Sequence, residues 1–161
     1  MFRGLIGNSK KRNEISAAQE IREQLSFWRV NLSVAHFKTA DLLDMGNRNA
    51  LLFPAIPQYE TLVKQLTKND RLILTVNIGT KEYEFLALAK FSQPSTRVPK
   101  KDYFEYPFVE YSYINSHYSD PIKVDFKNPA GAGQVHRILG KNEVSELDKL
   151  IEQLLARSIE I

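Results

Sequence analysis

The chain contains no cysteine among its 161 residues. This absence excludes disulfides, thiolate nucleophiles, zinc sites built on thiolates and iron–sulfur clusters. The sequence also lacks the run of about 18 consecutive apolar residues that a membrane-spanning helix needs. Its first residues, 1–7, contain no apolar stretch long enough for a signal peptide. We therefore expect a cytoplasmic protein without a membrane span.

Strong charge of one sign is absent too. The 22 basic and 19 acidic residues leave a formal net charge of +3, which permits anionic partners without requiring them. Hydrophobic residues make up 43% of the chain, which is typical of a globular protein. The length fits one domain, so we expect a single domain over residues 1–161, with one candidate break near residues 93–102.

Apolar residues at spacings of three and four predict helices over residues 13–25, 58–68 and 142–158. Asn13 and Asn142 are the residues expected to cap the first and last of these helices. Glu143 is expected to favour the start of the last helix through its charge.

Apolar residues at alternate positions predict strands. The clearest case is a hairpin formed by residues 72–76 and 83–89. Further strands are expected over residues 28–34, 50–53, 103–114 (interrupted by Pro107) and 121–126, and a turn over 128–133. The order of elements predicts an α+β fold: a small, bent antiparallel β-sheet or split β-barrel with flanking N-terminal and C-terminal helices.

Residues that could perform chemistry are scattered along the sequence. The three histidines, His36, His117 and His136, have no histidine neighbour at the spacing of a helical metal site. Each is expected to have a structural or surface role. Glu82 and Glu84 fit a solvated strand face better than a pair of catalytic acids. We therefore predict no catalytic residues, no metal site and no cofactor.

Two surfaces are candidates for binding. An aromatic segment follows two lysines, and Lys100, Lys101, Tyr103 and Tyr106 together would suit stacking and phosphate contacts with a nucleic acid. The alternative is that these aromatic side chains fill the core.

The second surface is the apolar stripe of the last helix. Leu147, Ile151 and Leu154 could contact a protein partner or a second copy of the chain in a homodimer. The alternative is that this stripe covers the sheet of its own chain.

Residues 27–93 resemble the N-terminal domain of flagellar-brake proteins in their strand order and apolar pattern. The segments that carry the resemblance are Phe37–Met45, Asn49–Phe53, Asp70–Leu74 and Tyr83–Phe85. In that family a small split β-barrel precedes a PilZ domain, which binds cyclic di-GMP through Arg-x-x-x-Arg and Asp/Asn-x-Ser-x-x-Gly motifs.

The matching positions here depart from both motifs. The first reads Arg-x-x-x-Lys, and in the second Ala130 replaces the serine. Lysine cannot reproduce the planar fork of arginine, and alanine lacks the hydroxyl. The resemblance thus implies a PilZ-like signalling adaptor with degenerate motifs. The ligand-binding residues that it implies are Arg97, Lys100, Lys101, Asn128 and Gly133.

These observations favour a non-enzymatic regulatory or interaction module. The alternatives are a small nucleic-acid-binding protein, and an enzyme whose site is assembled from residues far apart in the sequence. A cavity holding His117 or His136 together with an acid would favour the enzyme.

Overall fold

The computed structural model of the chain describes residues 16–32, 51–54, 65–79, 82–91, 98–99, 103–106, 109–126 and 135–161. Its helical elements are α2 (Ala17–Gln24), the short 3-10 helix η1 (Asn115–His117) and α5 (Lys141–Ala156). Its strands are β1 (Ser26–Leu32), β2 (Leu51–Pro54), β3 (Asp70–Gly79), β4 (Glu82–Phe91), β5 (Val98–Pro99), β6 (Tyr103–Tyr106), β7 (Val109–Ile114) and β8 (Val135–Arg137).

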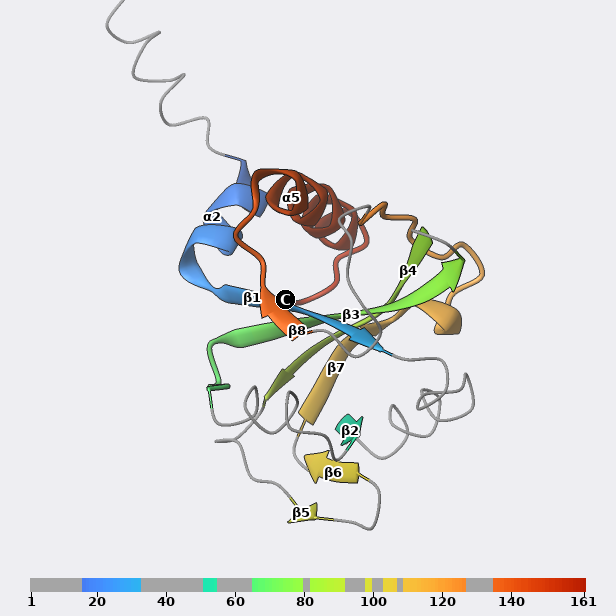
Figure 1. Cartoon of the computed structure of the whole chain (residues 1–161). Helices are drawn as coiled ribbons and strands as arrows, with labels where there is room; N and C mark the ends of the chain where they lie inside the picture. Colours follow the sequence, from blue (N-terminus) through green and yellow to red (C-terminus); the bar gives the residue numbers. More distant parts are fainter. Residues whose placement is uncertain are drawn as a thin grey trace, which may run out of the picture.

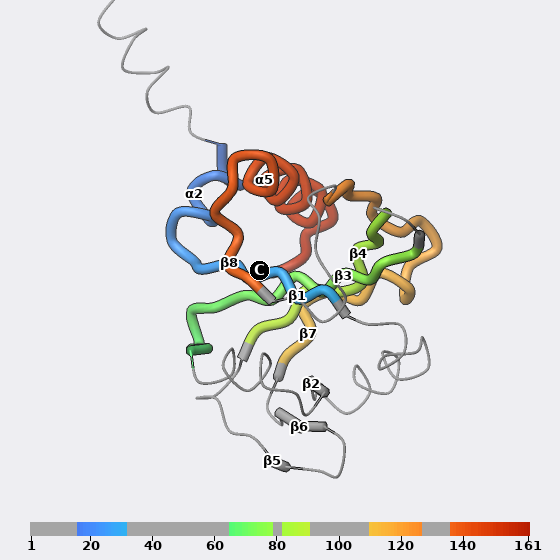
Figure 2. The backbone as a smooth tube through the Cα atoms, viewed as in Figure 1, coloured from blue at the N-terminus to red at the C-terminus, as the bar shows by residue number. Residues whose placement is uncertain are grey.

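A five-stranded sheet with the order β7-β4-β3-β1-β8 organises the fold, and β2, β6 and β5 form a three-stranded sheet. Helices α2 and α5 lie beside each other over one face of the larger sheet (Figures 1 and 2). The register shifts between Leu74 and Thr75 and between Leu88 and Ala89. Such bulges bend a sheet. The predicted α+β class with flanking helices and a small bent sheet is confirmed.

The predicted hairpin is confirmed as β3 and β4, which pair antiparallel. The sheet is mixed, however, because β1 and β3 run parallel, with Trp28 opposite Leu72. Parallel neighbours need a long connection between them, and residues 33–69 provide it. Alternation predicts a strand but not its direction relative to its neighbours, so an antiparallel sheet was the wrong expectation for this pair.

Several other elements begin or end at residues that differ from the prediction. Residues 121–126 form no strand, although Ile122 and Phe126 are buried as the alternation predicted. In the described end of the predicted helix 58–68, residues 65–68 are not helical. The N-cap of α2 is Ser16, whose side chain accepts a hydrogen bond from the Gln19 N–H. Gly140 rather than Asn142 is the N-cap of α5. Asn13 and residues 128–133 lie outside the described residues.

The apolar stripe of α5 packs against the five-stranded sheet. Leu147, Ile151 and Leu154 are each 0% exposed and belong to one cluster with Ile73, Leu88 and other core residues. The stripe therefore covers the sheet of its own chain, which corrects the prediction that these three residues form a partner surface. A side chain that is already buried in the core has no area left for another protein.

Polar residues interrupt the helix-covered face of the sheet at one end. Arg29 and Asn31 alternate with Trp28 and Val30 along β1, a pattern typical of a strand with one face in solvent. Both are instead 0% exposed, as is Thr75 of β3, which stands opposite Asn31. The core is thus apolar under most of α5 and polar near its first turn.

We expect Leu150→Ala to lower the free energy of unfolding by about 2–5 kcal/mol, because Leu150 is completely buried against the sheet and alanine would leave a cavity. Urea denaturation measures the change. Leu139→Ala is the matched control, since Leu139 is 73% exposed and its truncation should change stability by less than about 0.5 kcal/mol. Equal effects of the two substitutions would contradict the packing described for α5.

Candidate functional site

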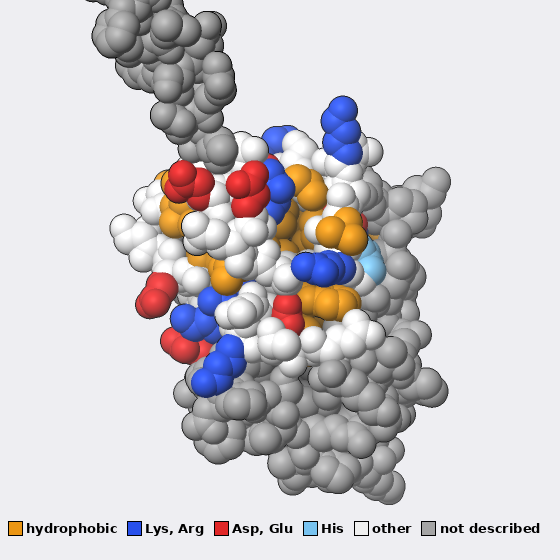
Figure 3. Space-filling model, turned by 90° about the vertical axis from the view of Figure 1, so that its left-hand side faces the viewer, with side chains coloured by type: hydrophobic (Ala, Val, Ile, Leu, Met, Phe, Trp, Pro, Cys, Tyr) orange, Lys and Arg blue, Asp and Glu red, His pale blue; other side chains and the backbone are white. Residues whose placement is uncertain are grey.

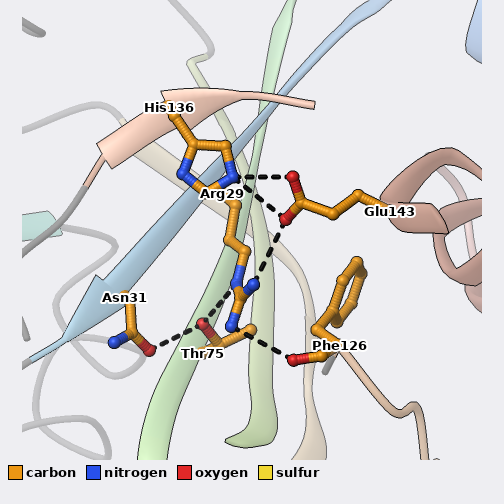
Figure 4. Close-up of polar contacts among 6 residues, drawn as sticks. All are labelled: Arg29, Asn31, Thr75, Phe126, His136 and Glu143. Atoms are coloured by element: carbon orange, nitrogen blue, oxygen red, sulfur yellow. Dashed lines mark hydrogen bonds and ion pairs between the residues drawn. The ribbon is translucent and has the colours of Figure 1, made fainter. Parts of the chain in front are cut away.

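The polar end of the core is built around the guanidinium group of Arg29. A buried cation is costly unless hydrogen bonds and an opposite charge replace its water. Arg29 Nε donates to Thr75 Oγ1 at 3.2 Å, Nη1 contacts Glu143 Oε2 at 3.2 Å, and Nη2 donates to the Phe126 carbonyl at 3.4 Å. These contacts join β1, β3, the end of segment 121–126 and α5 (Figure 4).

Two aromatic rings also lie close to this cation. The guanidinium carbon lies 4.6 Å from the centre of the Tyr83 ring and 5.3 Å from that of the Phe126 ring. Aromatic faces attract a cation that has lost its water. The same arginine is further ordered through Thr75, whose hydroxyl donates to Asn31 Oδ1 at 3.0 Å. Arg29 is therefore fixed in position and not free to move toward a ligand.

Glu143 connects this cluster to the edge of the sheet. Its side chain is 6% exposed, and its oxygens lie 2.8 and 3.0 Å from Nε2 of His136 on β8. This contact is a hydrogen bond to the carboxylate when Nε2 carries a proton. The other ring nitrogen, Nδ1, is buried and has no hydrogen-bond partner in the described chain. Glu143 thus holds β8 to the first turn of α5.

The pKa values of the pair follow from burial and charge. Burial raises the pKa of Glu143, but the His136 hydrogen bond and the Arg29 charge outweigh burial and hold this pKa below its ordinary value of 4.5. Burial lowers the pKa of Arg29, and its contacts with Glu143 oppose that shift. Glu143 is therefore a carboxylate that is stabilised in its charged form, the opposite of an acid poised to donate a proton.

Two of the cavities that the described residues form are lined by neither His136 nor Glu143. A cavity of about 330 Å³ lies beside the β3–β4 hairpin, between Tyr83 and Phe85 on one side and residues 121–124 on the other. The other, of about 270 Å³, lies between the end of α2, the start of β1, residues 137–139 and α5. His117 is exposed in η1. These cavities do not provide the pocket with a histidine and an acid that would favour an enzyme.

The second cavity adjoins β8, which is an edge strand of the described sheet. The Ile138 N–H donates to the Phe27 carbonyl at 2.8 Å, so Phe27 and Ile138 form a hydrogen-bonded pair. The next pair along the ladder, Trp28 with Arg137, is then a non-hydrogen-bonded pair. The backbone N–H and C=O of Arg137 therefore point away from β1, toward the open edge.

Figure 3 shows this side of the molecule, where apolar side chains gather with basic and acidic ones around them. The most exposed large apolar residue here is Leu139, at 73%, and it lines the cavity together with Arg137. An extended backbone with free donors and acceptors, next to an exposed apolar side chain, is a template for another strand.

The residues predicted from the sequence fall elsewhere. Arg97, Lys100, Lys101, Asn128 and Gly133 lie outside the described residues, as does His36. Tyr103 and Tyr106 are the two ends of β6, where they pair with Pro54 and Leu51. Glu82 and Glu84 are exposed, as expected for a solvated face.

Sequence reasoning missed the cluster of Arg29, Glu143 and His136. Arg29 is separated by 114 residues from Glu143 and by 46 from Thr75. No local sequence motif therefore indicates the cluster. The one available signal was an arginine inside a strand of strong β-formers, Trp28, Val30 and Leu32.

Within the described ranges, no three His, Asp or Glu side chains lie close enough together to hold a metal ion. Among the described helices, none combines the length and the apolar composition that a membrane span requires.

Comparison with known proteins gives structural likeness alone. No protein-family model matches the chain, and no curated protein sequence does. The solved structures that are similar to this chain include three at 11% identity. Protein PSPTO5229 from Pseudomonas syringae has a TM-score of 0.43 over 80% of this chain and 98% of its own length. A hypothetical protein from Leishmania major has a TM-score of 0.42 over 83% and 98%. Rpa0253 from Rhodopseudomonas palustris has a TM-score of 0.38 over 54% of this chain, and the chain spans 61% of its length.

We expect Arg29→Met to lower the free energy of unfolding by about 3–5 kcal/mol, because it leaves the Glu143 carboxylate buried beside a neutral side chain. The double variant Arg29→Met, Glu143→Leu should be more stable than Arg29→Met alone, since no uncompensated charge remains. Urea denaturation of both variants measures this.

The control is Arg22 with Asp148, an ion pair of 2.6 Å whose side chains are 23% and 26% exposed. Arg22→Met should cost no more than about 1 kcal/mol, because solvent screens this pair. If Arg29→Met costs no more than Arg22→Met, the buried cluster does not carry the stability assigned to it.

We expect acid to weaken the fold through Glu143. Because its pKa is lower in the folded than in the unfolded protein, its stabilisation is complete above pH 4.5 and is lost as the pH falls toward the folded pKa. The free energy of unfolding of the native chain should therefore drop more steeply below pH 4.5 than that of Glu143→Gln. Urea denaturation across this acid range tests the difference, and parallel profiles for the two proteins would contradict it.

Proposed function

We propose that this chain is a non-enzymatic interaction module that binds an extended peptide segment as an added strand along β8. The observation that carries the proposal is the outward direction of the Arg137 backbone N–H and C=O at an edge of the sheet. A peptide that pairs with such an edge gains backbone hydrogen bonds whatever its sequence, and its side chains then give specificity through nearby pockets.

The surroundings of β8 suit this role. The cavity of about 270 Å³ begins at Arg137 and Leu139, directly beside the edge, so a side chain of the added strand has a place to enter. Leu139 is exposed and would be covered by a partner. A segment that binds at this edge would therefore bury apolar surface in addition to forming backbone hydrogen bonds.

The buried cluster of Arg29, Glu143 and His136 supports the proposal because it holds β8 in position. His136, between Val135 and Arg137, turns its side chain inward to Glu143, which in turn contacts Arg29. A strand held from behind loses little freedom when a peptide pairs with its other side, and a smaller entropic cost favours binding.

A narrower form of the proposal remains a prediction. A PilZ-like adaptor that binds cyclic di-GMP would use Arg97, Lys100, Lys101, Asn128 and Gly133, which the described structure does not include. The nucleic-acid alternative likewise rests on Lys100, Lys101 and the side chains of Tyr103 and Tyr106, and it too stays a prediction.

Selection from a display library of short random peptides tests strand addition, because the partner need not be known. We expect enriched peptides with micromolar dissociation constants by calorimetry. Arg137→Pro should abolish their binding, since proline removes the outward N–H and leaves the hydrogen bonds to β1 intact. Arg137→Ala is the matched control, because it removes the side chain but keeps the backbone N–H donor. The same peptides should still bind this variant.

A second measurement does not depend on a variant that folds. N-methylation of the strongest peptide, one position at a time, should weaken binding at alternate residues, because only every second residue of an added strand faces β8. Failure to enrich any peptide would overturn the proposal, as would N-methylation that has no alternating effect.

A further inference from the structure

We infer that the segment added to β8 carries an acidic side chain, Asp or Glu, opposite Arg137. This inference rests on the proposed function and names the chemistry of its partner. In a pair of strands, side chains directly opposite each other stand on the same face about 4.5–5.5 Å apart, and opposite charges there are favourable. The residue of an added strand that faces Arg137 would therefore lie beside its guanidinium group.

Arg137 has the charge and the accessibility that this contact needs. Its side chain is exposed, and Nη2 donates to Ser26 Oγ at 2.7 Å, which orients the guanidinium along the sheet. A guanidinium has several N–H donors, and this one makes no ion pair with an acid in the described part of the chain. A carboxylate can thus bind it without displacing an existing partner.

The wider surroundings of the cavity contain a second arginine. Arg22 lines it and donates through Nε to Asp148 Oδ1 at 2.6 Å, so its charge is already balanced. Glu23 is the acidic residue of the lining, and it forms no ion pair with either arginine in the described structure. Of the two arginines that line this cavity, Arg137 is therefore the one without an acidic partner in the described structure, and it belongs to the open edge itself.

The start of α5 adds to the preference for an anion. Gly140, the N-cap, follows Leu139 directly and provides no side chain to cap the first turn. The free N–H groups of a helix N-terminus carry a partial positive charge. Lys141, the first residue of α5, is exposed and basic. Residues 137–141 therefore present positive charge along one short stretch of surface.

Leu139 indicates a second feature of the partner. It lies two residues beyond Arg137, is 73% exposed and borders the cavity. β8 ends at Arg137, but the Ile138 N–H still donates to the Phe27 carbonyl, so the alternation of faces continues beyond the strand toward Leu139. An added segment that places its acid opposite Arg137 would thus cover Leu139 best with an apolar side chain two positions away. The expected signature is an acidic and an apolar residue separated by one residue.

The test uses the strongest peptide from the display selection, synthesised with Glu, Gln or Lys at its acidic position and with its C-terminus amidated. Against the native chain at low salt, the Glu form should bind about two- to fivefold more tightly than the Gln form, and the Lys form more weakly than both. Arg137→Gln should remove the difference between Glu and Gln. Arg137→Glu should reverse the preference in favour of Lys.

The outcomes of this binding experiment separate the acidic partner from strand addition itself. If Glu and Gln peptides bind the native chain equally, while N-methylation still weakens binding at alternate positions, the acidic partner is overturned and strand addition stands. If the preference for Glu persists in Arg137→Gln, the carboxylate binds elsewhere and the inference fails. If tight binding needs a free C-terminal carboxylate instead of the side chain, the inference fails as well. If no peptide binds, the proposed function and this inference fail together.

Discussion

The arrangement of this molecule depends on the need to neutralise one buried cation. Arg29 has no exposed surface, so every partner that replaces its water must come from the chain. Those partners include a threonine on β3, a carbonyl at the end of segment 121–126, a glutamate on α5 and the rings of Tyr83 and Phe126. Elements far apart in the sequence can meet at Arg29 only if the sheet, the helix and the connecting segment adopt one relative arrangement.

A purely apolar core could hold the same elements together without fixing their relative orientation as closely. Under α5, Leu147, Leu150 and Leu154 pack against the sheet through contacts that have no preferred direction. At the start of α5 the contacts are directional, because a carboxylate must reach both Arg29 and His136. The apolar part therefore supplies most of the favourable free energy, and the polar part fixes where α5 begins relative to β1 and β8.

Apolar periodicity predicted the elements that have one clear buried face. The hairpin of β3 and β4, the strand β1 and the helix α5 were all expected from their patterns. The periodicity does not give exposure, because Arg29 and Asn31 alternate with apolar residues and yet are completely buried. Alternation shows that the two faces of a strand differ chemically, but it does not show which of them meets water. That depends on what the rest of the chain packs against each face.

The candidate site was hidden for the same reason. Glu143 appeared only as a residue that favours the start of a helix, and His136 as an isolated histidine, since seven residues and a change of backbone direction separate them. Nor could the edge have been found from the pattern, because β8 is three residues long and follows the glycine-containing segment 128–133. A strand this short has no periodicity to detect. It is recognisable only after β1 is available to pair with it.

β8 is connected to the core and is also open along one edge, and both properties follow from the alternation of its residues. At His136 the backbone pairs with Arg29 of β1 and the side chain turns toward Glu143, so this residue connects the strand to the core. At Arg137 the backbone turns outward and the side chain lies on the opposite face, against Ser26. One residue therefore anchors the strand, and the next directs its backbone N–H and C=O toward the open edge. Because neighbouring residues in a strand must face opposite ways, the contacts that hold β8 in the core also determine the direction of its open edge.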